Sequence, residues 1–439
     1  MTTALRPDQL HATIERALNE QPIVDMHTHL YSPQFGTPVP NAAGPIDPDG
    51  LLLWGIDELV TYHYLVAEVY RYVPTSKLPY EQFWKMTKQE QADHIWKYCF
   101  VENSPLSEAC RGILTTLTDL GLDPNEKSLD AYRPYFARQK PSDYIDKVMQ
   151  LANVSSITMT NPVFDDNERN RWLNNPKLNT DKRFNAVLRI DPLLRAWPTA
   201  AKKLSEWGYS VTEEITPSTI EQVKKFLRDW LHRQNAIYLA VSLDPAFRYP
   251  AEASDPIARA GQTILEKAIL PVCAERGLPW AMMIGSRMRV NPALRDAGDM
   301  CGKSDIASVV NLCHQFPDNK FFVTMLAREN QHELCVAARK FGNLMVFGCW
   351  WFLNNPSLIE EIERMRIELL GMSFIPQHSD ARVLDQLVYK WKHSRKILAK
   401  VMTDKYADIM ATGRRVTESE IHRDCRQFLS DNFTNFLAR

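Results

Sequence analysis

The sequence predicts an α/β protein built around a closed barrel of eight parallel strands, a (β/α)8 or TIM barrel. Short apolar runs typical of strands recur along the chain, and helical patterns separate most of them. Strands that alternate with helices form parallel β/α units, and eight such units close into a barrel. The eight runs are 23–26, 155–159, 184–190, 236–241, 280–284, 321–325, 344–347 and 372–375.

The chain divides into four stretches that differ in composition and hydrophobic pattern. Residues 1–50 hold an amphipathic helical pattern, the first strand and a loop rich in proline and glycine. Residues 51–150 are helical and rich in aromatic side chains, which we interpret as a helical insertion after the first strand. Residues 151–385 carry the remaining barrel strands, and residues 386–439 are expected to form C-terminal helices.

Composition excludes several classes of protein. The 439 residues include 52 basic and 53 acidic ones, with a formal net charge of −1. This balance argues against nucleic-acid or anionic-membrane binding, which depends on clustered positive charge. No signal-like segment and no run of about 18 apolar residues is present. The 8 cysteines form no C-x-x-C pair, as is usual for reduced thiols. We expect a soluble, cytoplasmic protein with no nucleic-acid or membrane partner.

Two histidines end the first strand run. His27 and His29 are one residue apart, so in a strand both side chains point to the same face. Neutral imidazole is a common ligand for zinc and similar divalent cations. An isolated H-x-H pattern is equally typical of two unrelated histidines, but the preceding apolar strand and Asp25 favour the metal interpretation. We predict one divalent metal ion, zinc, at this strand end.

Asp380 is the candidate third ligand. It lies in the stretch His-Ser-Asp-Ala-Arg (378–382), just after the last strand run. A carboxylate at this position can ligate a metal, accept a proton, or do both at different steps. A Ser-Asp pair before a helical run is also typical of a helix N-cap. The residues alone leave both interpretations open.

Six motifs, in order along nearly the whole chain, resemble those of the uronate isomerase (glucuronate isomerase) family of the amidohydrolase superfamily. The most specific are the double tryptophan and the Asp-x-Arg. The resemblance implies an amidohydrolase-type (β/α)8 barrel with a helical insertion after strand 1 and C-terminal helices. The motifs are Asp-Met-His-Thr-His-Leu (25–30), His63-Tyr64, Val-Leu-Arg-Ile-Asp-Pro (187–192), Ile284-Gly285 followed by Arg287, Arg289 and Asn291, Phe-Gly-Cys-Trp-Trp-Phe (347–352) and Ser-Asp-Ala-Arg (379–382).

The resemblance also implies a role for each matching residue. Arg189 would hold the substrate carboxylate, since a guanidinium suits bidentate binding; the alternative is a surface salt bridge. The Arg382 cation would favour the phenolate of Tyr64, which could then act as a base at carbon; the alternative is an aromatic of the insertion's core. The implied sets are His27, His29 and Asp380 for the metal, Asp380, Tyr64 and Arg382 for catalysis, and Arg189, His63, Trp350, Trp351 and Arg287 for substrate binding.

The implied reaction is an aldose–ketose interconversion of a hexuronate. The pairs are D-glucuronate with D-fructuronate, or D-galacturonate with D-tagaturonate, and a proton would move from C2 to C1 through a cis-enediol. Tyr64 is expected as the base and Asp380 as the proton shuttle. The partner is a small sugar acid, and a homo-oligomer is expected because large barrels often assemble.

Two departures from the family pattern keep other functions open. Met283 stands where the family has a histidine, and Ser242-Leu243-Asp244-Pro245 stands where Ser-Asp-His is expected. A thioether is a poor ligand for a hard metal and no general base. The second hypothesis is a metal-dependent hydrolase or decarboxylase acting on another carboxylate, which the missing histidines weaken. The third is a non-catalytic sugar-acid binder, which would not need a metal set.

Overall fold

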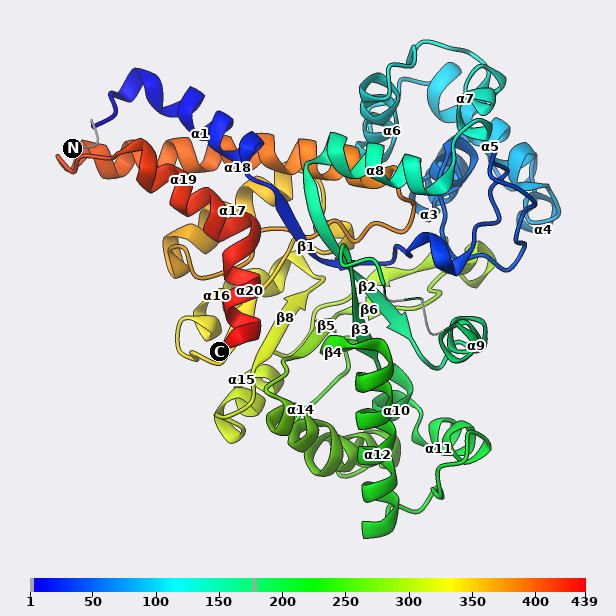
Figure 1. Ribbon diagram of the computed structural model, residues 1–439, viewed down its shortest axis with the longest axis vertical. Helices are drawn as coiled ribbons and strands as arrows, with labels where there is room; N and C mark the ends of the chain where they lie inside the picture. Colours follow the sequence, from blue (N-terminus) through cyan, green and yellow to red (C-terminus); the bar gives the residue numbers. More distant parts are fainter. Residues whose placement is uncertain (1–3, 176–177, 179) are drawn as a thin grey trace.

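A curled sheet of parallel strands forms the centre of the protein (Figure 1). The computed structural model describes residues 4–439 except 176, 177 and 179. The seven strands lie side by side in chain order, as expected for successive β/α units. They are β1 (Ile23–Thr28), β2 (Val154–Pro162), β3 (Phe184–Arg189), β4 (Ala236–Leu243), β5 (Trp280–Ile284), β8 (Phe321–Met325) and β9 (Leu344–Val346).

An irregular segment closes the ring between β9 and β1. The expected eighth strand over 372–375 is reduced to one parallel bridge between Phe347 and Ile375. The chain then runs on to residues 380–381, which bond to the end of β1. The barrel prediction is confirmed, with this segment in place of a regular eighth strand. The four backbone bonds are Ile375 N to Val346 O (3.0 Å), Gly348 N to Ile375 O (2.8 Å), Asp380 N to His27 O (3.1 Å) and His29 N to Ala381 O (2.7 Å).

Helices cover the outside of the barrel between successive strands (Figure 1). Their ends follow local sequence signals. The long α12, for example, begins after Thr216, whose hydroxyl accepts a bond from the Thr219 backbone, and ends at Asn235 in the left-handed conformation. The outer helices are α8 (Pro141–Ala152), α9 (Asp166–Asn174), α10 (Asp191–Arg195), α11 (Trp197–Glu206), α12 (Pro217–Gln234), α13 (Pro256–Ile264), α14 (Leu270–Arg276), α15 (Ile306–Gln315), α16 (Gln331–Ala338) and α17 (Pro356–Leu370).

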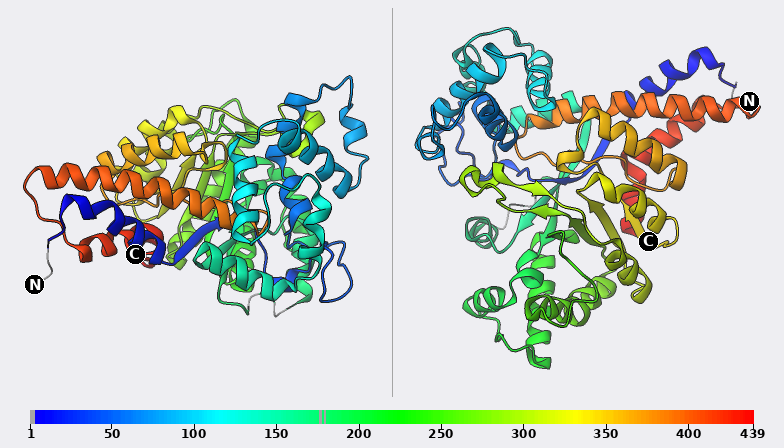
Figure 2. Two further views of the ribbon diagram at one scale, coloured as in Figure 1. Left: turned by 90° about the horizontal axis from the view of Figure 1, so that it is seen from above. Right: turned by 180° about the vertical axis from the view of Figure 1, so that it is seen from behind.

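Short helices between β1 and β2 form a cluster at one side of the barrel (Figure 2). A hairpin of β6 (Ser286–Arg287) and β7 (Met300–Cys301) reaches this cluster. Trp84 joins the two, since its indole N–H donates to Ala293 O (2.8 Å) and the Arg295 guanidinium lies 4.4 Å from its ring. The cluster holds α2 (Ile56–Val60), α3 (His63–Tyr72), α4 (Tyr80–Phe83), α5 (Lys88–Trp96), α6 (Glu108–Asp119) and α7 (Arg133–Ala137).

N-terminal and C-terminal helices pack together on another side of the barrel. Helix α1 (Leu10–Glu20) packs on α18 (Gln386–Ala411) and α19 (Glu418–Arg426). The last helix, α20 (Asn432–Ala438), places Phe433 and Phe436 against Tyr238 and Phe322, near the amino ends of β4 and β8. One end of the barrel is thereby filled with aromatic side chains. Among the described helices, none has the length and apolarity needed to cross a membrane.

A buried arginine holds the closing segment in place. Arg366 of α17 donates to Gly348 O (2.7 Å), just after β9, and to Pro376 O (3.3 Å), four residues before Asp380. Its side chain has 0% exposure, and it forms an ion pair of 3.3 Å with Glu363, which is 1% exposed. Burial raises the pKa of Glu363 to about 7. The Arg366 guanidinium therefore links the end of β9 to the segment that closes the barrel.

We expect Arg366→Met to destabilise the fold strongly. The substitution leaves the buried Glu363 carboxylate and two carbonyls without their donor, and removal of one member of a buried pair costs about 3–5 kcal/mol. Arg364→Met is the matched control, because Arg364 lies on the same helix but pairs with Glu360 and Asp404 at the surface; its loss is expected to stay under about 1 kcal/mol. Urea unfolding measures both, and equal losses would contradict the role of Arg366.

We also expect Glu363 to make stability pH-dependent. Its pKa is raised from 4.5 to about 7 in the fold, so the native state holds the proton more tightly than the unfolded chain. The stability it contributes is fully present below pH 4.5 and is lost as the pH rises through about 7. Relative to Glu363→Gln, the free energy of unfolding should fall over this window by up to roughly 3 kcal/mol. Urea titrations across the window measure it, with exposed Glu361→Gln as control. A difference that rises with pH would refute the raised pKa.

Candidate active site at the carboxyl end of the barrel

A cavity of about 270 Å³ lies at the carboxyl ends of the strands. Because α20 fills the opposite end, this is the open end of the barrel. Each neighbouring strand contributes the residue at or next to its end: His27 from β1, Pro162 from β2, Arg189 from β3, Ser242 from β4 and Met283 from β5. Active sites in this fold lie at this end of the strands.

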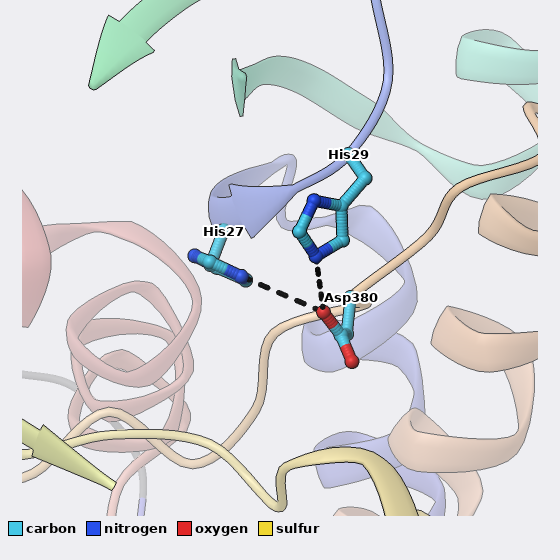
Figure 3. A group of neighbouring side chains, drawn as sticks. All are labelled: His27, His29 and Asp380. Carbon is cyan, nitrogen blue, oxygen red and sulfur yellow. Dashed lines mark ion pairs between the residues drawn. The ribbon is translucent and has the colours of Figure 1, made fainter. Parts of the chain in front are cut away.

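The three predicted metal ligands meet in this cavity (Figure 3). Asp380 Oδ1 lies 3.5 Å from His27 Nε2 and 3.4 Å from His29 Nε2. Their possible ligand atoms all lie within 4.8 Å of one another. The two histidines come from β1 and the aspartate from the segment that closes the barrel. The closure of the barrel at this point therefore brings the three side chains together.

The chemistry of this group fits a divalent cation. His27 Nε2 and Asp380 Oδ1 are buried and have no hydrogen-bond partner in the part of the chain that the structure describes, which is costly unless a cation satisfies them. Burial lowers the pKa of His29 to about 4, so its ring is neutral and keeps a lone pair. Burial opposes ionisation of Asp380, but its interactions with His27 and His29 outweigh this and hold its pKa well below the usual range. Two imidazole nitrogens and one carboxylate suit zinc.

A neighbouring hydroxyl orients the first histidine. Thr160 Oγ1, at the end of β2, lies 3.1 Å from His27 Nδ1. When Nδ1–H donates to this hydroxyl, Nε2 carries the lone pair and faces Asp380. Thr160 therefore orients the ring of His27 but is not itself one of the three predicted ligands.

The backbone is strained at two cavity residues. Asp380 has φ = 50° and Trp351 has φ = 46°, both in the left-handed region. This region is tolerated by aspartate but uncommon for a bulky residue such as tryptophan, and such outliers cost about 1–3 kcal/mol each and cluster at functional sites. The bond from Asp380 N to His27 O holds the aspartate in this conformation.

Three guanidinium groups line the same cavity: Arg189, Arg195 and Arg382. Arg189 donates to Asp191 (2.8 and 3.0 Å) and to Ser242 Oγ (3.0 Å), which holds its side chain at the end of β3. Arg189 thus forms an ion pair with Asp191, which was the alternative to substrate binding, and it also faces the cavity. A cavity with this many guanidinium groups suits a carboxylate.

Aromatic rings form another wall of the cavity. Trp350 and Trp351 follow β9, and His63 begins α3 of the insertion. The His63 and Trp351 rings lie 5.3 Å apart, so the insertion contacts the barrel at the cavity itself. Burial lowers the pKa of His63 to about 3, and its ring is therefore neutral. These three predicted residues do line the cavity.

Tyr64 does not line the cavity; Tyr62 and His63 do. Successive helical residues point about 100° apart, so a cavity-facing His63 turns Tyr64 to another face of α3. Burial raises the pKa of Tyr64 well above its usual value, which disfavours the phenolate expected from the sequence. Its hydroxyl is buried and has no hydrogen-bond partner among the described residues.

Arg287 also lies outside the cavity, which corrects its expected place in the substrate site. It is exposed and lines a separate shallow depression with Lys303. Side chains alternate in β6, so Ser286 and Met288 face the cavity while Arg287 faces outward.

Several lining residues were not identified from the sequence. Arg195 follows Arg189 by six residues on a helix, and Asp296 lies in the hairpin loop; neither belongs to a recognisable motif. Ser242 and Met283 stand at the two departures from the family pattern, and both face the cavity. His378, beside the metal group, is buried with its ring 5.3 Å from His27 but does not line the cavity. The other missed lining residues are Tyr31, Tyr62, Thr160, Pro162, Ser286, Met288 and Asp299.

A comparison with solved structures finds a close relative of this chain. No protein-family model and no curated protein matches the chain. A uronate isomerase from Bacillus halodurans C-125 is 50% identical, with 100% of this chain and 98% of that chain covered and a TM-score of 0.92.

Two more distant structures share the fold. A uronate isomerase from Thermotoga maritima is 14% identical, with 99% of this chain and 98% of that one covered and a TM-score of 0.77. A glucuronate isomerase from Caulobacter crescentus is 14% identical, with coverages of 98% and 94% and a TM-score of 0.73. At 50% identity to the Bacillus protein over its full length, the chain belongs to the uronate isomerase family.

Proposed function

We propose that the protein interconverts a hexuronate aldose and its ketose, D-glucuronate with D-fructuronate or D-galacturonate with D-tagaturonate. The observation that carries this proposal is the meeting of the His27–His29–Asp380 group with Arg189 and Arg382 in one 270 Å³ cavity. A polyhydroxy acid needs both features, since it presents a carboxylate at one end and a carbonyl at the other. The 50% identity to a uronate isomerase supports the same assignment.

The metal in this proposal is one divalent ion, zinc. His27, His29 and Asp380 would hold it, as their unpartnered buried atoms suggest. When bound, the ion supplies Lewis-acid stabilisation of negative charge on a substrate oxygen.

The arginines and aromatic rings bind the substrate. Arg189 takes the carboxylate, because its guanidinium is already oriented by Asp191 and Ser242. Trp350 and Trp351 wall the sugar and exclude water, and the neutral His63 ring bonds to substrate hydroxyls. Arg382 lies beside Asp380 and stabilises charge that develops on the carbonyl oxygen.

Asp380 moves the proton. Its Oδ1 is directed at the two histidines, and Figure 3 shows its second oxygen, Oδ2, pointing away from both rings. Since its pKa lies well below the usual range, the carboxylate is ionised and can accept a proton from C2. The C2–H electrons form the C1–C2 double bond of the enediol as the C1 carbonyl electrons move to O1, which takes up a proton. The hydroxyl on C2 then loses its proton and becomes the carbonyl, and the same carboxylate oxygen returns the first proton to C1. One carboxylate on one face of a cis-enediol therefore completes the transfer.

Tyr62, which lines the cavity, is proposed as a hydrogen-bond donor in place of the base expected at Tyr64. Burial raises the pKa of Tyr62 well above its usual value, so its phenol is protonated at neutral pH. The hydroxyl can donate to a substrate oxygen on which charge develops.

Hydrolysis and decarboxylation are less well supported. The strand-end positions of β4 and β5 that face the cavity carry Ser242 and Met283, and neither side chain is a base at neutral pH. A non-catalytic binder would not need the ionised Asp380 beside His27 and His29. We further propose a cytoplasmic, homo-oligomeric enzyme whose partner is the small sugar acid.

Conversion of hexuronates tests the proposal directly. We expect the zinc-loaded protein to form ketose from D-glucuronate or D-galacturonate, followed by NMR, and to exchange a substrate C2 deuteron with solvent. Asp380→Asn should lose about 10²–10⁴-fold in kcat and bind less zinc, while Asp296→Asn, at the same cavity, should keep its zinc. No ketose from any hexuronate, with hydrolysis of a lactone or amide instead, would reject the assignment.

Tyr62→Phe should lower kcat by about 10²–10³-fold with little change in fold stability, because only a charge-stabilising donor is removed. Tyr64→Phe is the matched control: its ring lies 5.0 Å from that of Tyr62 and its phenol is buried, but it does not line the cavity. Steady-state kinetics compare the two. Full turnover by Tyr62→Phe would exclude this role.

A further inference from the structure

The residue just before Asp380 is held on both sides by buried side chains that carry ionisable groups. Ser379 has 0% exposure, and its backbone N–H donates to the two carboxylate oxygens of Asp25, at 3.2 and 3.3 Å. Its carbonyl oxygen accepts from Lys390 Nζ of α18, at 2.6 Å. The next N–H, that of Asp380, donates to His27 O at 3.1 Å. The backbone that leads into the aspartate is therefore bonded at each of these groups.

A buried lysine is uncommon at such a place. Lys390 is 4% exposed, and lysines are almost never fully buried unless they are paired. Among the described residues its Nζ forms no ion pair: it bonds to the Ser379 carbonyl and lies 5.9 Å from the Tyr64 ring. Burial lowers the pKa of Lys390, and the charges of Asp380 and Asp25 act in the opposite direction. Apolar side chains usually fill a buried place at no greater cost than charged ones, so packing alone does not explain the lysine.

The bond from Lys390 acts against backbone strain at Asp380. The aspartate has φ = 50°, and such conformations persist only where the surrounding structure holds them. The peptide between Ser379 and Asp380 is fixed at its oxygen by Lys390 and at its nitrogen by His27 O. Without the first bond this peptide can rotate and move the carboxylate away from His27 and His29. Loss of a group that orients a metal ligand typically costs about 10–100-fold in metal affinity or activity.

We propose that Lys390 is a positioning residue, whose hydrogen bond to the Ser379 carbonyl holds Asp380 in the geometry that binds a divalent ion. The inference rests on the metal site of the proposed function. It concerns binding of the ion alone, however, so it is tested without turnover and with zinc as the probe.

Lys390→Met removes the donor and keeps an unbranched side chain of similar length. We expect its affinity for zinc, measured by competition with a chelating dye, to fall about 10–100-fold. Lys390→Gln, which is neutral and one bond shorter, should also bind zinc more weakly, and it replaces Lys390→Met if the apolar variant does not fold. Lys392→Met is the matched control: Lys392 lies on the same helix, but it is 57% exposed and pairs with Asp119 at 2.6 Å. Its zinc affinity should equal that of the wild type.

Urea unfolding with and without zinc separates positioning from a purely structural role. Zinc stabilises the fold according to its affinity, so a site weakened 10–100-fold reduces the stabilisation by zinc by about 1.4–2.7 kcal/mol. A purely structural role of Lys390 would instead lower stability equally in both conditions. Circular dichroism confirms that each variant is folded.

Two outcomes would overturn the proposal. One is wild-type zinc affinity in a folded Lys390 variant, and the other is a loss of stability that is equal with and without zinc. Both leave the proposed function standing if the wild-type protein still forms ketose from a hexuronate. Conversely, a wild-type protein that binds zinc through this geometry but forms no ketose would reject the proposed function and support the role of Lys390.

Discussion

The site depends on how the barrel closes between β1 and residues 375–381, a junction called the seam here. The bonds from Asp380 N to His27 O and from His29 N to Ala381 O join residues that are about as far apart in the chain as the barrel allows. Because these bonds fix both backbones, the side chains of His27, His29 and Asp380 converge without any long loop between them. The convergence of His27, His29 and Asp380 is therefore a consequence of closing the sheet, and the barrel backbone fixes its geometry.

The seam has an energetic cost that buried groups around it offset. Asp380 and Trp351 lie in the left-handed region, and Arg366 and Glu363 carry charges into the interior. The Arg366 guanidinium compensates part of this cost through bonds to Gly348 O and Pro376 O. A sharp turn after β9 also requires Gly348 at φ = 65°, where any Cβ would lie 1.7 Å from His378 Nδ1. Strain, buried charge and close packing thus accumulate behind the face that carries the chemistry.

The helical insertion and the β6–β7 hairpin decide the shape of the cavity more than the strands do. His63 and Tyr62 approach from α3, Met288 and Asp296 from the hairpin, and Trp84 joins the two elements through Ala293 O. A barrel alone would leave His27, His29 and Asp380 open to solvent. The roof formed by these segments makes a 270 Å³ cavity in which guanidinium groups and neutral histidines interact at reduced dielectric.

The sequence by itself determined the barrel and half of its site, because both follow from short-range regularities. Continuous apolar runs located β5 and β8 at their observed bounds, and the period of a strand placed His27 and His29 on one face. Motif order then pointed to Asp380, Arg189 and the double tryptophan. Only the tertiary structure decided that 372–375 is a single bridge, that Tyr64 turns from the cavity while Tyr62 faces it, and that Arg287 points outward. Arg195 and Asp296 reach the cavity through folding over long sequence distances, and no local pattern encodes that approach. Side-chain direction at a helix start or in a two-residue strand depends on the backbone path, which packing sets.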